Sequence, residues 1–90
     1  MSSDQSELGF EFPGSFELTA FGVASEGLID TVVTEMVLAG VLPDRDAVTT
    51  RASRDGNYLA VRVPFKAETR AQWGEAHARL RRLPSVRWTM

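Results

Sequence analysis

The sequence predicts an α+β sandwich in which a four-stranded antiparallel sheet carries two helices on one face. The central observation is the pair Asp55-Gly56, which lies between two segments of alternating apolar and polar residues, 47–53 and 58–65. An Asp-Gly pair in this setting is a strong signal of a β-hairpin. An amphipathic helical pattern lies on each side of the hairpin, and a further short strand lies beyond each helix. The resulting order, βαββαβ, predicts a split βαβ fold.

The first strand is predicted over residues 15–23, where apolar and polar residues alternate for most of its length. The first helix is predicted over residues 26–39, because apolar residues recur there every three or four positions. Ser25 is the predicted N-cap of this helix, since a serine hydroxyl can accept a hydrogen bond from a free backbone N–H. Gly40 is expected to end the helix.

The hairpin turn is expected to have a structural role. Gly56 can supply the positive φ that a tight type I′ turn demands, and Asn57 tolerates the same region. The strand that follows, over residues 58–65, has one apolar face, formed by Leu59, Val61, Val63 and Phe65. Pro64 lacks a backbone N–H, so we expect strand pairing to be incomplete near it, or the strand to be exposed there.

The second helix is predicted over residues 68–83, and Pro84 ends it. Its apolar stripe contains Trp73, Ala76, Leu80 and Leu83. His77, the only histidine, lies beside that stripe and is expected to be a partly exposed helix residue. The last strand is predicted over residues 85–90, where three apolar residues alternate with two polar ones: Val86, Trp88 and Met90 against Arg87 and Thr89.

The composition describes one small domain over residues 12–90, preceded by a disordered acidic tail over residues 1–11. The chain lacks cysteine, which excludes disulfides and thiolate chemistry. Its first residues have neither the basic nor the apolar region of a signal peptide, and its apolar runs are too short to span a bilayer. We therefore expect a cytoplasmic protein with no membrane contact.

Charge is distributed unevenly along the chain. Residues 1–44 contain eight acidic residues and no Lys or Arg, whereas residues 45–90 contain ten Lys and Arg and four acidic residues. The second half could form a nucleic-acid surface, or the two halves could complement each other within one fold. We favour the second interpretation, because a chain with a net charge of −2 lacks the basicity expected of a polyanion binder.

A sheet with both helices on one face leaves its other face open. Strand alternation predicts that this open face carries Glu17, Thr19, Phe21, Arg51, Tyr58, Arg62, Arg87 and Thr89. Tyr, Phe and Arg are enriched in protein interfaces, so the face could form a homodimer, as could a sheet edge. It could also be plain solvated surface, or it could stack bases of single-stranded nucleic acid, which is less expected. The predicted partner contacts are Phe21, Arg51, Tyr58, Arg62 and Arg87.

Several short motifs occur in an order that matches a known family. They are the opening Phe12-Pro13-x-x-Phe16, then Gly22, the turn Ser53-x-x-Gly56-Asn57-Tyr58, Ala67, and Val86-Arg87 in the last strand. Over about residues 12–90 the chain resembles the YbeD-like family of uncharacterised bacterial proteins. The resemblance implies a ferredoxin-like βαββαβ fold close to the ACT-type regulatory domains that bind small metabolites, and it implies no established activity. The acidic extension through Glu11 lies outside the resemblance, and Pro64 departs from it.

The loop 22–27, between the first strand and the first helix, is the predicted ligand site, with Gly22, Ser25 and Gly27 as its binding residues. Free amides at a helix N-terminus favour an anion, and small residues let a ligand approach the backbone. In ACT-type domains the corresponding loop helps to hold an amino-acid effector, and the resemblance implies the same here. Glu26 opposes a carboxylate ligand, and the alternative, that the loop is a tight connection with a serine cap, is the more expected of the two.

No set of residues converges on a nucleophile, a base and an oxyanion site, so we expect no enzymatic activity, no cofactor and no metal. We expect a non-enzymatic regulatory or adaptor domain that self-associates and binds a small metabolite, or another protein. The alternative is RNA or single-stranded nucleic-acid binding through the open sheet face.

Overall fold

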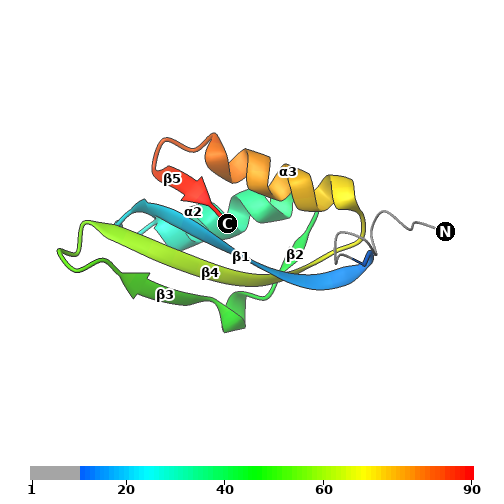
Figure 1. Ribbon diagram of the computed structural model, residues 1–90, viewed down its shortest axis with the longest axis horizontal. Coiled ribbons are helices and arrows are strands. Elements are labelled where there is room, and N and C mark those ends of the chain that lie inside the picture. The colour runs from blue at the N-terminus through cyan, green and yellow to red at the C-terminus, as the bar shows by residue number, and fades with distance from the viewer. Residues whose placement is uncertain (1–10) are drawn as a thin grey trace.

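The computed structural model describes residues 11–90, so all but the last residue of the predicted tail lies outside the described residues. Both helices cover the same face of an antiparallel sheet, as Figure 1 shows, which confirms the α+β fold. The elements are β1 (Gly14–Val23), α2 (Leu28–Leu38), β2 (Leu42–Pro43), the 3₁₀ helix η1 (Arg45–Ala47), β3 (Thr49–Ala52), β4 (Tyr58–Ala67), α3 (Arg70–Arg81) and β5 (Val86–Thr89).

The long antiparallel pair of β1 and β4 forms the centre of the sheet. Its register runs from Gly14 opposite Ala67 to Val23 opposite Tyr58. β5 pairs with the other side of β1, and both β2 and β3 pair with β4. The elements therefore follow the predicted βαββαβ order, except that two short strands, β2 and β3, form the edge beside β4.

Pro64 explains why that edge is broken. Pro43 of β2 pairs with Phe65, and Thr49 of β3 pairs with Arg62, so η1 lies in the gap opposite Pro64. The Pro64 carbonyl accepts a hydrogen bond from the Asp44 N–H at 2.8 Å. The N–H and C=O of one strand residue point to the same side, so the donor that proline lacks faces this interruption. The incomplete pairing expected from the sequence is confirmed, although the predicted loop also contains β2.

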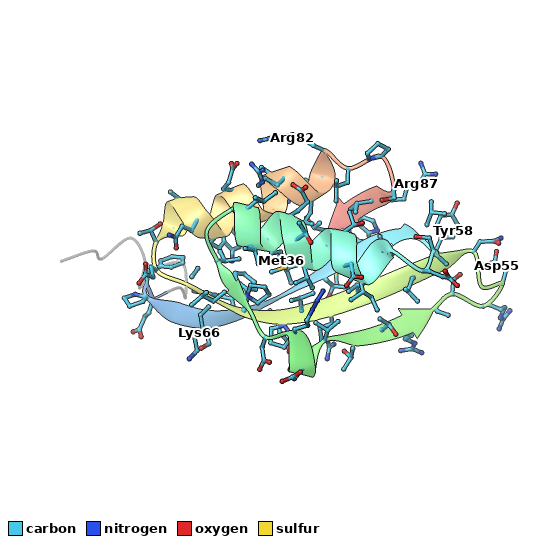
Figure 2. The ribbon with its side chains drawn as sticks, turned by 180° about the vertical axis from the view of Figure 1, so that it is seen from behind. Met36, Asp55, Tyr58, Lys66, Arg82 and Arg87 are labelled. Carbon is cyan, nitrogen blue, oxygen red and sulfur yellow. The ribbon has the colours of Figure 1, made fainter. Side chains whose placement is uncertain are left out.

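The core lies between the helices and the inner face of the sheet. Met36, fully buried, points from α2 toward the sheet (Figure 2). A buried aliphatic side chain of this kind stabilises a fold by roughly 1.5–3 kcal/mol. The largest fully buried side chains are Leu18, Leu28, Met36, Leu80, Val32, Val41, Val61 and Val63.

The hairpin loop differs from the predicted type I′ turn. Gly56 has φ +77°, but neither Asp55 nor Asn57 has a positive φ, so the prediction for Asn57 is wrong. The Ser53 N–H donates to the Tyr58 carbonyl at 2.9 Å, which closes a longer loop. The Asp55 carboxylate accepts from the Asn57 backbone N–H at 3.1 Å and from the Ser53 hydroxyl at 2.8 Å. These bonds lower the pKa of Asp55 and fix the loop without a second left-handed residue.

Each helix begins two residues later than predicted. The N-cap of α2 is Gly27, with no side-chain hydrogen bond, so the prediction that Ser25 caps the helix is wrong. The N-cap of α3 is Thr69, whose hydroxyl accepts from the Gln72 N–H at 3.2 Å, while the Gln72 side chain accepts from the Glu68 N–H at 2.9 Å. Gly40, with φ +94°, follows the end of α2 as predicted.

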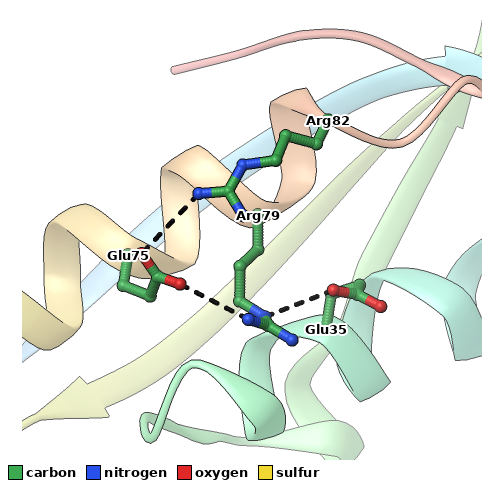
Figure 3. A network of polar contacts seen from close by, with 4 residues as sticks. All are labelled: Glu35, Glu75, Arg79 and Arg82. Carbon is green, nitrogen blue, oxygen red and sulfur yellow. Dashed lines mark hydrogen bonds and ion pairs between the residues drawn. The ribbon is translucent and has the colours of Figure 1, made fainter.

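Ion pairs join the acidic first half of the chain to the basic second half. Glu35 on α2 and Arg79 on α3 lie 3.3 Å apart, and Glu75 adds contacts to Arg79 and Arg82 (Figure 3). Two further pairs that cross between the halves are Asp30 with Arg45 at 2.6 Å and Glu17 with Arg62 at 3.8 Å. This pairing supports the interpretation that the uneven charge is largely complementary within the fold.

Candidate functional site

A β-bulge in β5 changes the composition of the open face. Trp88 pairs with Phe21 and Val86 pairs with Gly22, so Arg87 is an extra residue between them. The extra residue reverses the alternation on one side of the bulge. Thr89 is consequently buried, and Trp88 is exposed at 54%. The prediction that Thr89 lies on the open face is therefore wrong. The prediction that Trp88 shares a face with Val86 is wrong for the same reason.

Exposed aromatic and apolar side chains gather on the open face. The rings of Phe21 and Trp88 stack with their centroids 4.9 Å apart and an interplanar angle of 18°. Met90 exchanges two backbone hydrogen bonds with Thr19, which places it on the same face, and it is 65% exposed. Tyr58 is 46% exposed. Exposed apolar groups that lie together in this way mark interaction surfaces more often than isolated ones do.

Ala60 lies at the bottom of a hollow in this face. Phe21, Ala60 and Arg51 form one row across β1, β4 and β3. Tyr58 and Arg62 flank Ala60 along β4, since alternate residues of a strand share a face. We call these five residues the Ala60 hollow. The short alanine side chain leaves open space between two aromatic and two guanidinium groups.

The Ala60 hollow consists of two adjoining clefts that share Phe21, Arg51 and Ala60. The first, of about 230 Å³, is also lined by Tyr58 and is mostly apolar. The second, of about 410 Å³, is also lined by Arg62, with Thr19, Thr49 and Met90 around it. An apolar group and an anionic group could therefore bind side by side.

The hollow carries positive charge. Glu17 pairs with Arg62, but both side chains are more than half exposed, so the pair contributes little and leaves Arg62 open to other anions. Within residues 11–90, no acidic side chain lies within ion-pair distance of Arg51. Arg51 is exposed and borders both clefts, so it is free to bind a carboxylate.

The structure brings together four of the five predicted contact residues. Phe21, Arg51, Tyr58 and Arg62 line the hollow, whereas Arg87 lies exposed at the β5 bulge and lines neither cleft. Sequence reasoning missed Ala60, although strand parity already placed it between Tyr58 and Arg62. It also missed Trp88 and Met90, because no local signal marks the bulge.

The predicted ligand loop has a packing explanation. Gly22 is buried, and a Cβ atom at this position would lie 2.6 Å from the Ser85 carbonyl oxygen and 3.2 Å from Leu28. The Ser25 carbonyl accepts from the Leu28 N–H at 3.3 Å, while Gly27 has open space around it. Close packing therefore accounts for Gly22, and ligand binding by Gly22, Ser25 and Gly27 stays a prediction.

His77 is buried rather than partly exposed, which corrects the prediction for this residue. Its Nδ1 lies 3.1 Å from the Thr89 hydroxyl, which also accepts from the Arg81 Nε at 3.1 Å. Burial, and then the charge of Arg81, lower the pKa of His77. The centroids of the His77 and Trp73 rings lie 4.7 Å apart. His77 therefore joins α3 to β5 within the fold.

Two further observations concern the part of the chain that the structure describes. It contains no group of three or more His, Cys, Asp or Glu residues placed to hold a metal ion. It also contains no helix with the length and apolar character needed to cross a bilayer.

A larger cleft, of about 500 Å³, lies at the end of the molecule opposite Asp55, where Figure 2 shows Lys66. Its lining residues are Pro13, Gly14, Ser15, Gly40, Leu42, Lys66, Ala67 and Glu68. Among the described residues that line it, Lys66 and Glu68 are charged and Ser15 carries a hydroxyl.

Comparison with known proteins places this fold in context. The model of a protein family of unknown function, DUF493, matches residues 7–90. UPF0250 proteins from Xanthomonas campestris and Stenotrophomonas maltophilia are each 40% identical over 90 residues, covering 100% of this chain and 98% of theirs. The solution structure of protein HP0495 from H. pylori superimposes with a TM-score of 0.68 at 12% identity, covering 100% of this chain and 94% of that one, which shows a shared fold. The chain therefore belongs to the DUF493/UPF0250 family, and its resemblance to YbeD-like proteins is confirmed.

Proposed function

We propose that this protein is a non-enzymatic regulatory or adaptor domain that binds protein through the open face of its sheet. The observation that carries the proposal is the Ala60 hollow, where Phe21 and Tyr58 face Arg51 and Arg62 on a surface that no helix covers. Aromatic residues, Met and Arg are enriched in protein interfaces, and Trp, Tyr and Arg are the most common binding hot spots.

The contrast with the helix side of the sheet supports this assignment. The inner face is filled by the core, so its side chains are accounted for by folding. The stacked pair of Phe21 and Trp88, together with Tyr58 and Met90, has no comparable role in the core, because no element lies over it. A partner that covers these groups would remove their apolar surface from water, which stabilises a complex.

The placement of His77 removes the imidazole from the candidate acid–base groups. His77 is the only imidazole in the chain, and its Nδ1 is engaged with Thr89 beneath α3. General acid–base catalysis requires a titrating group within reach of a substrate proton. A buried imidazole that joins two elements does not meet this requirement.

Site-specific photo-crosslinking in living cells tests the proposed surface. A photoreactive phenylalanine analogue replaces either Tyr58 on the open face or Val37 on α2, which is 55% exposed and serves as the control. We expect a discrete protein adduct from position 58, lost when Arg51→Glu is added, and no adduct from position 37. Adducts from position 37 alone would assign binding to the helix side and overturn the proposal.

Single-stranded nucleic acid is a second candidate for the same face, favoured by the aromatic rings beside Arg51 and Arg62. Glu17 on this face and the net charge of −2 oppose it. It predicts oligonucleotide binding that weakens steeply with salt and is lost in Tyr58→Ala. Fluorescence anisotropy at low salt measures this, and the absence of binding there eliminates the candidate.

Metabolite binding at residues 22–27 is the finer part of the regulatory proposal. An amino acid or related anion held by Ser25 and Gly27 must raise the melting temperature when its concentration exceeds its Kd. A thermal-shift screen up to millimolar concentrations tests this. A flat response removes the metabolite and leaves the open-face proposal unchanged.

A further inference from the structure

We propose that the Ala60 hollow binds the acidic N-terminal segment of a second copy of this chain. The inference rests on the proposed function, because it names the partner of the same face. Residues 1–11 contain Asp4, Glu7 and Glu11 and no Lys or Arg, and they include the apolar residues Leu8 and Phe10. This is the acidic and apolar chemistry that the hollow would select.

The two clefts of the hollow match the two kinds of side chain in that segment. The apolar cleft beside Tyr58 measures about 230 Å³, smaller than the roughly 300–1,000 Å³ of most small-molecule sites, so it suits a single side chain such as that of Phe10. Arg51 and Arg62 beside it can donate charge-assisted hydrogen bonds to Glu7 or Glu11. Peptide binding thus accounts for both the aromatic and the arginine groups.

The geometry of β1 keeps Phe10 out of the apolar cleft of its own chain. Glu11 lies against Gly14, where β1 begins, and Phe21 in the hollow is seven residues farther along, or ~24 Å at ~3.4 Å per residue. Phe10 is one residue from Glu11, so its Cα lies at most ~4 Å from that of Glu11. Phe10 therefore cannot reach the apolar cleft of its own chain, whereas the Phe10 of a second copy has no such constraint.

Charge complementarity also favours the segment over a face-to-face dimer that is centred on the hollow. A symmetric dimer whose two-fold axis passes through the hollow would place Arg51 and Arg62 of one copy against the same arginines of the other. Like charges brought together in an interface oppose association. An acidic segment exchanged between copies instead neutralises each hollow.

Light scattering and analytical ultracentrifugation of the full chain test the proposal. We expect concentration-dependent self-association that weakens with salt, because exposed charge pairs are screened. Arg51→Glu and Phe10→Ser should each weaken association at least tenfold. Arg54→Glu, an equal charge change in the exposed hairpin loop outside the hollow, should leave it unchanged.

A charge exchange provides the decisive comparison. A chain carrying Arg51→Glu, mixed with a chain carrying Glu7→Arg and Glu11→Arg, should regain association that neither chain shows alone. Ala60→Leu, which fills the hollow, should abolish association, and thermal melting checks that each variant is folded. If Ala60→Leu fails to fold, the exposed Arg51 variant still decides the question.

A chain that stays monomeric at all concentrations, or association that is insensitive to Arg51→Glu and Phe10→Ser, would overturn the inference. The proposed function would stand in that event if position 58 still crosslinked to a different protein. Loss of the position 58 adduct, with self-association intact through another surface, would instead overturn both.

Discussion

The two faces of the β1–β4 pair differ in what determines their residues. On the inner face, Leu18, Ala20, Val61 and Val63 are at most 1% exposed and pack beneath the helices. On the outer face, Phe21 and Ala60 occupy the same strands but have no element above them. Folding therefore explains the inner residues, whereas the aromatic and arginine groups of the outer face are the residues on which the proposed binding rests.

The largest expected effect belongs to the inner face. Leu18→Ala removes a side chain that is 1% exposed and leaves a cavity, so it should lower the free energy of unfolding by about 3–4 kcal/mol. Urea denaturation monitored by circular dichroism measures this. A loss below about 1 kcal/mol would show that the inner face is far less tightly packed than its burial indicates.

An intermediate effect is expected where Gly22 of β1 lies against Ser85 and the first residue of α2. Gly22→Ala places a Cβ atom 2.6 Å from the Ser85 carbonyl oxygen, and such overpacking should cost about 1–3 kcal/mol. Gly27→Ala is the matched control, because it meets open space at φ −90°. Gly27→Ala should be neutral or stabilising by up to about 1 kcal/mol. Equal losses in both variants would contradict the packing explanation of Gly22.

A pH-dependent effect on stability is expected at His77, which lies against Thr89 of β5. The folded-state pKa of His77 lies below its ordinary value of 6.5, so the unfolded chain binds the proton more readily. The stability contributed by neutral His77 is complete above about pH 6.5 and is lost as the pH falls through the lowered pKa. Thermal melts between pH 5 and 8 should show this decline, and His77→Gln should flatten it. An unchanged slope in His77→Gln would assign the decline to other groups.

The smallest expected effect on stability belongs to the outer face. Tyr58→Ser removes an exposed ring and should change the free energy of unfolding by less than about 0.5 kcal/mol. The same variant should weaken partner binding substantially, since aromatic residues are common hot spots. Urea denaturation measures the change in stability, and sedimentation of the same preparation measures the change in binding. A large loss of stability would mean that folding, and not binding, explains the outer face.

The sequence alone determined the order of the elements and the inner face of the central strands. Alternation along residues 58–65 identified Val61, Val63 and Phe65 as core residues, and Gly40 marked the end of the first helix. These features depend on periodicity and backbone preference within a few neighbouring residues, which a single sequence records directly. Pro64 likewise indicated a gap in pairing, because its missing donor is a local property.

Only the tertiary structure decided the shape of the open face. The bulge at Arg87 exposes Trp88 and buries Thr89, and it exists because β5 must match β1, more than sixty residues away in the chain. The Ala60 hollow requires β1, β3 and β4 in register, and His77 is buried because Thr89 lies beneath it. Such features arise from contacts between distant segments, whose register no local pattern specifies.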